Sequence, residues 1–177
     1  MKRAAGLILL GGLFALLQTV VWPRIIGWQV KPDLILVLAV YIGLTEKRLA
    51  GTLLVLLLGT FLDAVSGNQP WLHVIILLSI LYSVYLLGSR LNTENMLLLH
   101  CLVAWATLIQ VFLLAFLGPF ADLAGFWREV LPGLFPQLVL NVLATALLLR
   151  LAPWLARRLA PGSVFPWLKQ LERGHGA

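Results

Sequence analysis

The sequence is short of charges, cysteines and catalytic motifs, and each shortage excludes a class of protein. Only 11% of the 177 residues are charged, against about 25% in an ordinary soluble domain. The lone cysteine, Cys101, excludes an internal disulfide, and Cys, His and Asp are too dispersed for the spacing of a metal site. Phosphate-binding loops, dinucleotide fingerprints and zinc-binding helices are also missing from the sequence. We therefore expect neither a metal nor a cofactor.

Hydrophobic residues are abundant instead and make up 61% of the chain. Apolar runs recur, several of them near the roughly 20 residues that a helix needs to cross a hydrocarbon core of about 30 Å. The pattern predicts an all-α polytopic membrane protein, with one integral membrane domain over residues 1–177. We predict six spans, at approximately residues 4–22, 31–45, 49–65, 71–87, 95–117 and 132–149.

The second predicted span is the shortest. Taken strictly it runs from Leu34 to Leu44, because Pro32 and Asp33 precede it and the charged turn of residues 46–48 follows it. A helix of that length must be tilted, extended to residues 30–45, or shielded from lipid by the rest of the protein. The sequence leaves these three alternatives open.

The basic residues predict how the chain is oriented. Thirteen Lys and Arg against seven Asp and Glu give a net charge of +6, which in a soluble protein suggests nucleic acid. Here they lie at the ends of apolar runs, so we expect no nucleic-acid partner. With six spans and cytoplasmic termini, the outer basic residues are only Arg24, Lys31 and Arg128, as the positive-inside rule requires. The tail of residues 150–177 mixes aromatic and basic residues, which predicts attachment to anionic lipid at the cytoplasmic face.

Asp63 is the strongest candidate for a functional residue, because an ionisable group at the centre of a bilayer costs about 2.5–3.5 kcal/mol. Asp33 lies near the same predicted outer level, but two carboxylates so far apart in the chain do not by themselves predict an aspartic dyad. Ser66, His73 and Asp63 make a hydrolase-like trio that lacks any supporting motif. Such residues serve more commonly as turn formers and helix caps.

Three further polar residues, Gln110, Gln137 and Asn141, lie deeper in the last two predicted spans. Hydrogen bonds between helices are their expected role, contributing about 0.6 kcal/mol each on average, and a substrate pocket is the alternative. His100 and Cys101 are sequence neighbours on one helix, so they do not face each other as a nucleophile pair requires.

Two stretches are candidates for contact with a partner. Gly11, Gly12 and Ala15 give the first span a small face on which another helix packs closely. Between the last two spans, apolar residues recur at helical spacing among charged ones, which predicts either a short amphipathic helix on the outer surface or a plain loop. The apolar residues of this pattern include Phe120, Leu123 and Trp127.

Residues 31–33 read Lys-Pro-Asp, residues 47 and 48 are basic, and residues 59–67 read Gly-x-x-x-Asp-x-x-Ser-Gly. This block of residues 31–67 resembles the bacterial rod shape-determining protein MreD family. That family has a basic or polar residue before Pro-Asp or Pro-Asn, an aromatic residue near the end of span two, a basic turn, and Gly-x-x-x-Asp-x-x-Ser-Gly closing span three. The corresponding residues here are Lys31, Pro32, Asp33, Tyr41, Lys47, Arg48, Gly59, Asp63, Ser66 and Gly67. Many members continue with Leu-Gly, whereas this chain has Pro70 and Trp71.

The resemblance implies a non-enzymatic inner-membrane component of the cell-wall elongation complex, which maintains cell shape. The implied partners are MreC, the RodA glycosyltransferase with its class B penicillin-binding protein, and indirectly the MreB filament. The family fold also resembles the substrate-binding membrane subunits of energy-coupling-factor vitamin transporters. A vitamin-binding subunit is therefore the alternative function, although the polar and aromatic groups that a pocket needs are sparse here.

Gly59 and Asp63 lie four residues apart and so share one face of a helix. We expect the glycine to let a neighbouring span approach closely. We expect the carboxylate to reach the backbone amides of the loop that follows, and neither residue to take part in catalysis.

Overall fold

The computed structural model describes residues 2–25, 32–66, 70–88, 96–117 and 131–159, and every regular element in these ranges is a helix. The prediction of an all-helical chain is confirmed for this part of the protein. Gly67 and the contact candidates Phe120, Leu123 and Trp127 lie outside the described residues.

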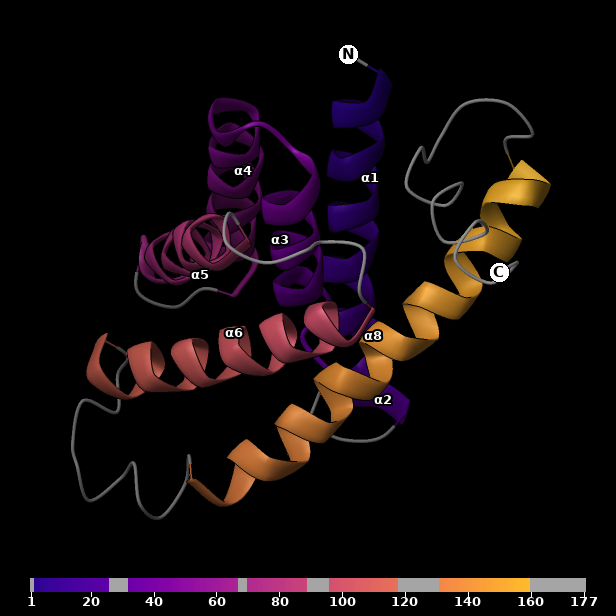
Figure 1. The fold of residues 1–177 in the computed structure, drawn as a ribbon. Helices are drawn as coiled ribbons and strands as arrows, with labels where there is room; N and C mark the ends of the chain where they lie inside the picture. The colour runs from indigo at the N-terminus through magenta and orange to yellow at the C-terminus, as the bar shows by residue number, and fades with distance from the viewer. Residues whose placement is uncertain (1, 26–31, 67–69, 89–95, 118–130, 160–177) are drawn as a thin grey trace.

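The described helices pack against one another as a bundle (Figure 1). In chain order they are α1 (Lys2–Leu16), a π-helical turn (Leu17–Val21), α2 (Trp22–Ile25), α3 (Leu34–Thr45), α4 (Arg48–Ser66), α5 (Leu72–Gly88), α6 (Met96–Leu117) and α8 (Leu131–Leu159). Three stretches are long and apolar enough to cross a membrane: Arg48–Ser66, Leu97–Leu117 and Pro132–Arg150. Three shorter apolar helical stretches accompany them: Ala5–Val20, Leu34–Thr45 and Leu72–Gly88. Each of these six stretches overlaps one of the predicted spans. Only the first three are long enough by themselves to cross a membrane.

The short helix α3 is the centre of the bundle, in contact with α1, α4, α5, α6 and α8. It lies beside α1 and α4 in Figure 1, and residues 35–40, Ile42 and Gly43 are all buried. A helix that is apolar on every side suits such a position, because it has no face turned to water. Its length of 12 residues is explained by the third alternative above, in which the surrounding helices shield it.

The helices α4 and α5 pack together closely because α4 carries glycines at the contact. A Cβ atom on Gly59 would lie 2.8 Å from the Cα of Val74 on α5, which is closer than real Cβ atoms come. A Cβ on Gly51 would overlap the hydroxyl of Tyr85, near the other end of α5. The glycines therefore set how near the two helix axes lie.

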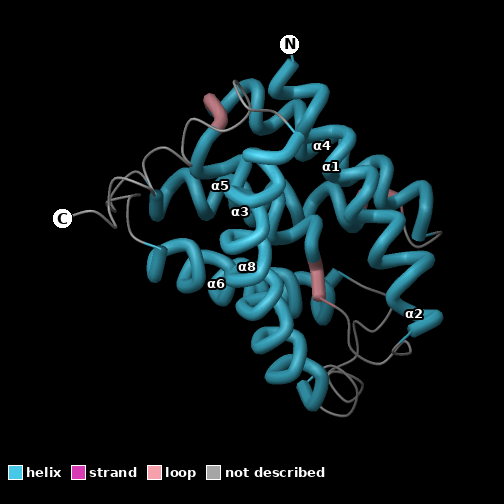
Figure 2. Tube along the Cα trace, turned by 90° about the vertical axis from the view of Figure 1, so that its right-hand side faces the viewer, coloured by secondary structure: helices cyan, strands magenta, loops and turns pink. Residues whose placement is uncertain are grey.

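The last helix, α8, runs without interruption for 29 residues from Leu131 to Leu159. It packs on α6 and α3, and α6 lies below α3 and α5 in both views (Figures 1 and 2). The proline at position 153 predicts a break in the helix, yet residues 150–159 continue α8. Proline removes one backbone hydrogen bond and crowds the preceding turn, and the flanking bonds of a long helix tolerate this loss.

Candidate functional site

The bundle contains two groups of polar side chains, and the larger one surrounds Asp33 at the start of α3. The Asp33 carboxylate accepts three hydrogen bonds: from Gln18 Nε2 at 3.1 Å, from the backbone N–H of Leu36 at 3.0 Å, and from Gln110 Nε2 at 2.5 Å. The backbone N–H of Asp33 donates to Asn141 Oδ1 at 2.7 Å. One residue thereby connects the π-helical turn after α1 with α3, α6 and α8.

The network continues from Asn141 into the interface between α6 and α8. Its Nδ2 donates to Thr107 Oγ1 at 2.9 Å, and the Thr107 hydroxyl donates to the carbonyl of Val103 at 2.8 Å. Asn141 and Thr107 are both 0% exposed. Since a polar group left unpaired in hydrocarbon is costly, these bonds fix how α6 and α8 are rotated against each other. We name Gln18, Asp33, Thr107, Gln110 and Asn141 the Asp33 cluster.

Gln18 reaches α3 from the π-helical turn that follows α1. Its Nε2 donates to the carbonyl of Pro32 at 2.8 Å as well as to Asp33. Turns of this kind occur frequently at functional positions within helices. Pro32 itself is buried and lacks an N–H, so the chain enters α3 without an unpaired donor at that residue.

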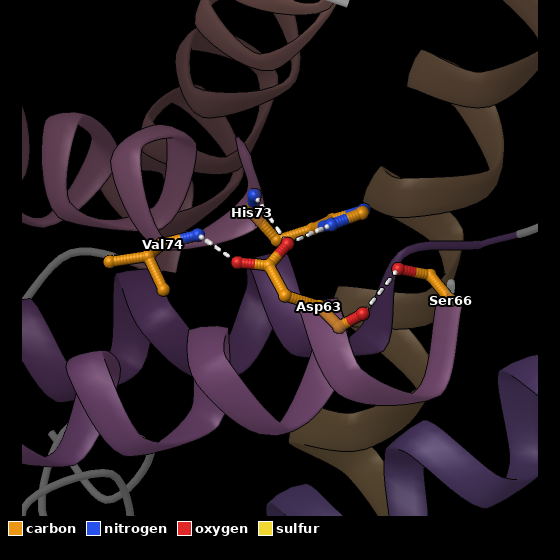
Figure 3. A network of polar contacts seen from close by, with 4 residues as sticks. All are labelled: Asp63, Ser66, His73 and Val74. Atoms are coloured by element: carbon orange, nitrogen blue, oxygen red, sulfur yellow. Dashed lines mark hydrogen bonds and ion pairs between the residues drawn. The ribbon is translucent and has the colours of Figure 1, made fainter. Parts of the chain in front are cut away.

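The second group joins the end of α4 to the start of α5 through Asp63 (Figure 3). Asp63 Oδ1 accepts from the backbone N–H of His73 at 2.9 Å and lies 2.7 Å from His73 Nδ1. Asp63 Oδ2 accepts from the backbone N–H of Val74 at 3.4 Å. A carboxylate at a helix N-terminus satisfies unpaired amides and faces the positive end of the helix dipole. Asp63 therefore caps α5 from a different helix.

Gly59 and Asp63 act on the same turn of α5. Val74 provides the Cα that packs against Gly59 and the N–H that reaches Asp63. One face of α4 thus supplies both the space and the hydrogen-bond acceptors for the first turn of the next helix. The close approach at Gly59 is as expected from the sequence, whereas the amides that Asp63 reaches belong to the first turn of α5 and not to the loop.

Ser66 does not complete a catalytic trio. Its hydroxyl donates to the backbone carbonyl of Asp63 at 3.4 Å, away from the imidazole of His73 (Figure 3). A serine nucleophile needs a base within hydrogen-bond reach. Nor do Asp33 and Asp63 form a dyad, because each carboxylate takes its donors from a different set of residues.

The small face proposed for the first span requires a correction. Gly11 and Ala15 are buried, and a Cβ on Gly11 would overlap the side chain of Leu58 on α4. Gly12 has nothing within 4 Å of its Cβ position. Successive helical residues point about 100° apart, so Gly12 cannot share the side of the helix that Gly11 and Ala15 turn inward. Only Gly12 is open to a partner.

Other candidates from the sequence have ordinary structural positions. Tyr41 is half-buried against the core formed by α1, α3, α4 and α5, and its carbonyl accepts from Thr45 Oγ1 at 2.9 Å. Cys101 is exposed on α6 and His100 is half-buried. In the described ranges no three His, Cys, Asp or Glu residues are grouped closely enough to hold a metal ion.

Sequence reasoning found Gln110 and Asn141 but missed two other members of the Asp33 cluster. Gln18 and Thr107 are buried and hydrogen-bonded, and the signal available was a polar side chain inside an apolar run. Gln137 was grouped with the bonded residues, yet it makes no hydrogen bond with any residue that the structure describes.

An all-helical bundle with long apolar helices and inward-facing polar side chains has the architecture of a membrane protein. A family model for the rod shape-determining protein MreD matches residues 3–158, and this chain belongs to that family. The resemblance drawn from residues 31–67 is thereby confirmed. Comparison with curated proteins and with solved structures gave no match. The family acts in rod shape determination and is not a known family of enzymes.

Proposed function

We propose that this protein is a non-enzymatic, multi-pass scaffold of the bacterial inner membrane, where it holds together the cell-wall elongation complex. Its partners in this proposal are MreC, the RodA glycosyltransferase and a class B penicillin-binding protein, with the MreB filament reached indirectly. The membership of residues 3–158 in a rod shape-determining family carries the proposal.

The internal bonding supports a scaffold role. A scaffold must present its lipid-facing surfaces at fixed relative positions, which requires helices that do not rotate or slide. The Asp33 cluster ties four elements together, and Asp63 ties α4 to α5. Because hydrogen bonds between helices replace the hydrophobic driving force that lipid does not supply, these bonds hold the bundle in one arrangement.

The proposed contact with a single-span partner such as MreC lies mainly within the bilayer. The described helices are joined by short connections, too short for a water-exposed interface of about 800 Å² per partner. The lipid-facing side of α1 carries Leu9, Leu13 and Leu16, all exposed, together with the open position of Gly12. Close helix packing at such a position is the usual mode of association in membranes. The segment 118–130 remains the second proposed contact.

Affinity purification from native membranes tests the proposal. An affinity-tagged copy of this chain, expressed at its natural level, is expected to recover MreC and RodA after gentle detergent extraction. A tagged multi-span protein of the same membrane with an unrelated role serves as the matched control. Deleting residues 120–128 is expected to lower MreC recovery while the protein still inserts. If the tagged protein restores rod shape to depleted cells yet recovers neither partner even after cross-linking, the scaffold assignment is wrong.

A further inference from the structure

The Asp33 carboxylate has only neutral hydrogen-bond donors among the residues that the structure describes. These donors are three amides: two side chains and one backbone N–H. Among the residues that the structure describes, no basic side chain pairs with it; the one ion pair found there joins His73 and Asp63. An ionised group at the membrane level with only neutral donors is expensive and marks a functional position.

Gln110 adds an unused acceptor at the same place. This side chain is 8% exposed, and its Oε1 accepts no hydrogen bond in the described structure. Because Oε1 belongs to the same planar amide as the Nε2 that donates to Asp33 Oδ2, the unused oxygen lies beside the carboxylate. A buried acceptor of this kind needs a donor, because leaving it unpaired costs the full desolvation penalty of the group.

The unused acceptor oxygens of the site fit a cation that has several N–H donors. Asp33 Oδ2 accepts one bond from the residues that the structure describes. A carboxylate oxygen has room for two, so Oδ2 has capacity for a second donor beside Gln110 Oε1. A primary ammonium group has three donors and a full positive charge. It satisfies both oxygens and neutralises the carboxylate through charge-assisted hydrogen bonds. A quaternary ammonium has no N–H and satisfies neither oxygen.

The position of the site agrees with such a ligand. Asp33 lies at the first turn of α3 rather than in its middle, and it is only part-buried. The end of a span is where lipid headgroups lie. We propose that Asp33 and Gln110 form a binding site for a primary ammonium group, supplied by an ethanolamine lipid headgroup or by a free amine. This inference stands independently of the scaffold role.

The test measures thermal unfolding of the purified full-length protein in detergent at pH 7.5. Phosphatidylethanolamine or phosphatidylcholine with identical acyl chains is added at equal mole ratio, and free ethanolamine or sodium chloride is added at equal ionic strength. Phosphatidylethanolamine is expected to raise the melting temperature by about 4 °C or more above the phosphatidylcholine value. If free ethanolamine gives the same rise, the amine alone is the ligand; if only the lipid does, the headgroup is recognised together with its chains.

Variants assign the effect to the site. Gln110→Leu removes both the unused acceptor and the donor to Asp33, and it is expected to abolish the preference for phosphatidylethanolamine. Gln137→Leu is the matched control on α8 and should keep the wild-type preference. Native mass spectrometry of retained lipids gives the same comparison for any variant whose melting is too broad to measure. Equal effects of the two lipids, a sodium chloride effect as large as that of ethanolamine, or an unchanged preference in Gln110→Leu each overturns the proposal.

Discussion

Asp63 at the end of α4 contacts His73 twice: its Oδ1 accepts a hydrogen bond from the backbone N–H at 2.9 Å and lies 2.7 Å from ring Nδ1. The Asp63 and His73 side chains are 9% and 19% exposed, so both lie largely within the protein. The pair fixes the direction in which α5 leaves α4, and α5 in turn packs against α3. The Gly-x-x-x-Asp part of the motif therefore lets α4 pack closely against the first turn of α5 and cap its N-terminus.

This capping role predicts how Asp63 variants behave. Asp63→Asn keeps an oxygen that accepts the His73 N–H and should lower stability only slightly. Asp63→Leu leaves the first amides of α5 unpaired and should cost about 1–2 kcal/mol. Thermal unfolding in detergent measures both, and restoration of rod shape to depleted cells reports function. Complete loss of shape control with Asp63→Asn in a normally folded protein would show that the charge itself is required.

Leucine substitutions at Gly59 and Gly12 should separate folding from partner binding. Gly59→Leu drives its side chain into the backbone of Val74, so we expect a large loss of folded protein. Gly12→Leu points into open space and should insert and melt like the wild type. On the proposed contact surface, however, it should reduce co-purification of MreC several-fold. Normal MreC recovery by Gly12→Leu would move the contact to another face.

Trp71 predicts a stabilising substitution. Its φ of 72° lies in the left-handed region, which costs residues with a Cβ about 1–2 kcal/mol. Trp71→Gly should therefore raise the free energy of unfolding by about 1 kcal/mol. Trp71→Ala removes the indole and keeps the Cβ, so it measures what the indole contributes. A lower melting temperature for the glycine variant than for the alanine variant would contradict the argument.

Asn141 should be the most sensitive polar residue of α8. Asn141→Leu removes its bonds to the Asp33 N–H and to Thr107, and it places a branched side chain in a fully buried position. We expect a loss of about 1–3 kcal/mol. Leu143→Ala, on the exposed side of the same helix, should change stability little. Hydrogen exchange should show α6 and α8 opening more readily in Asn141→Leu alone.

Reporter fusions test the predicted orientation. Fusions after residues 48, 90 and 174 should read as cytoplasmic, and those after residues 69 and 122 as periplasmic, because most basic residues then lie inside. Cysteine labelling from either side of the membrane provides an independent measurement. A periplasmic signal at residue 174 would mean an odd number of spans.

The sequence alone was sufficient for the helical class, the places of the apolar helices and the family. These properties follow from local hydropathy and from a contiguous motif, and neither depends on how one helix is rotated against another. The sequence also predicted that Gly59 and Asp63 lie on the same face of a helix, because residues four apart share a face whatever surrounds the helix. The same reasoning could not show that α3 would lie at the centre of the bundle. A short apolar segment has the same sequence pattern whether lipid or other helices surround it.

Only the tertiary structure decided which polar side chains meet and which small residues face inward. Asp33 is bonded to residues 15, 77 and 108 positions away, and no local pattern specifies such partners. Gly11 and Gly12 differ by a single step in sequence, yet one packs against α4 and the other is open. The reason is geometric: one residue turns a helix by about 100°, so the rotation of each helix, set by packing against all its neighbours, determines whether a residue is core or surface.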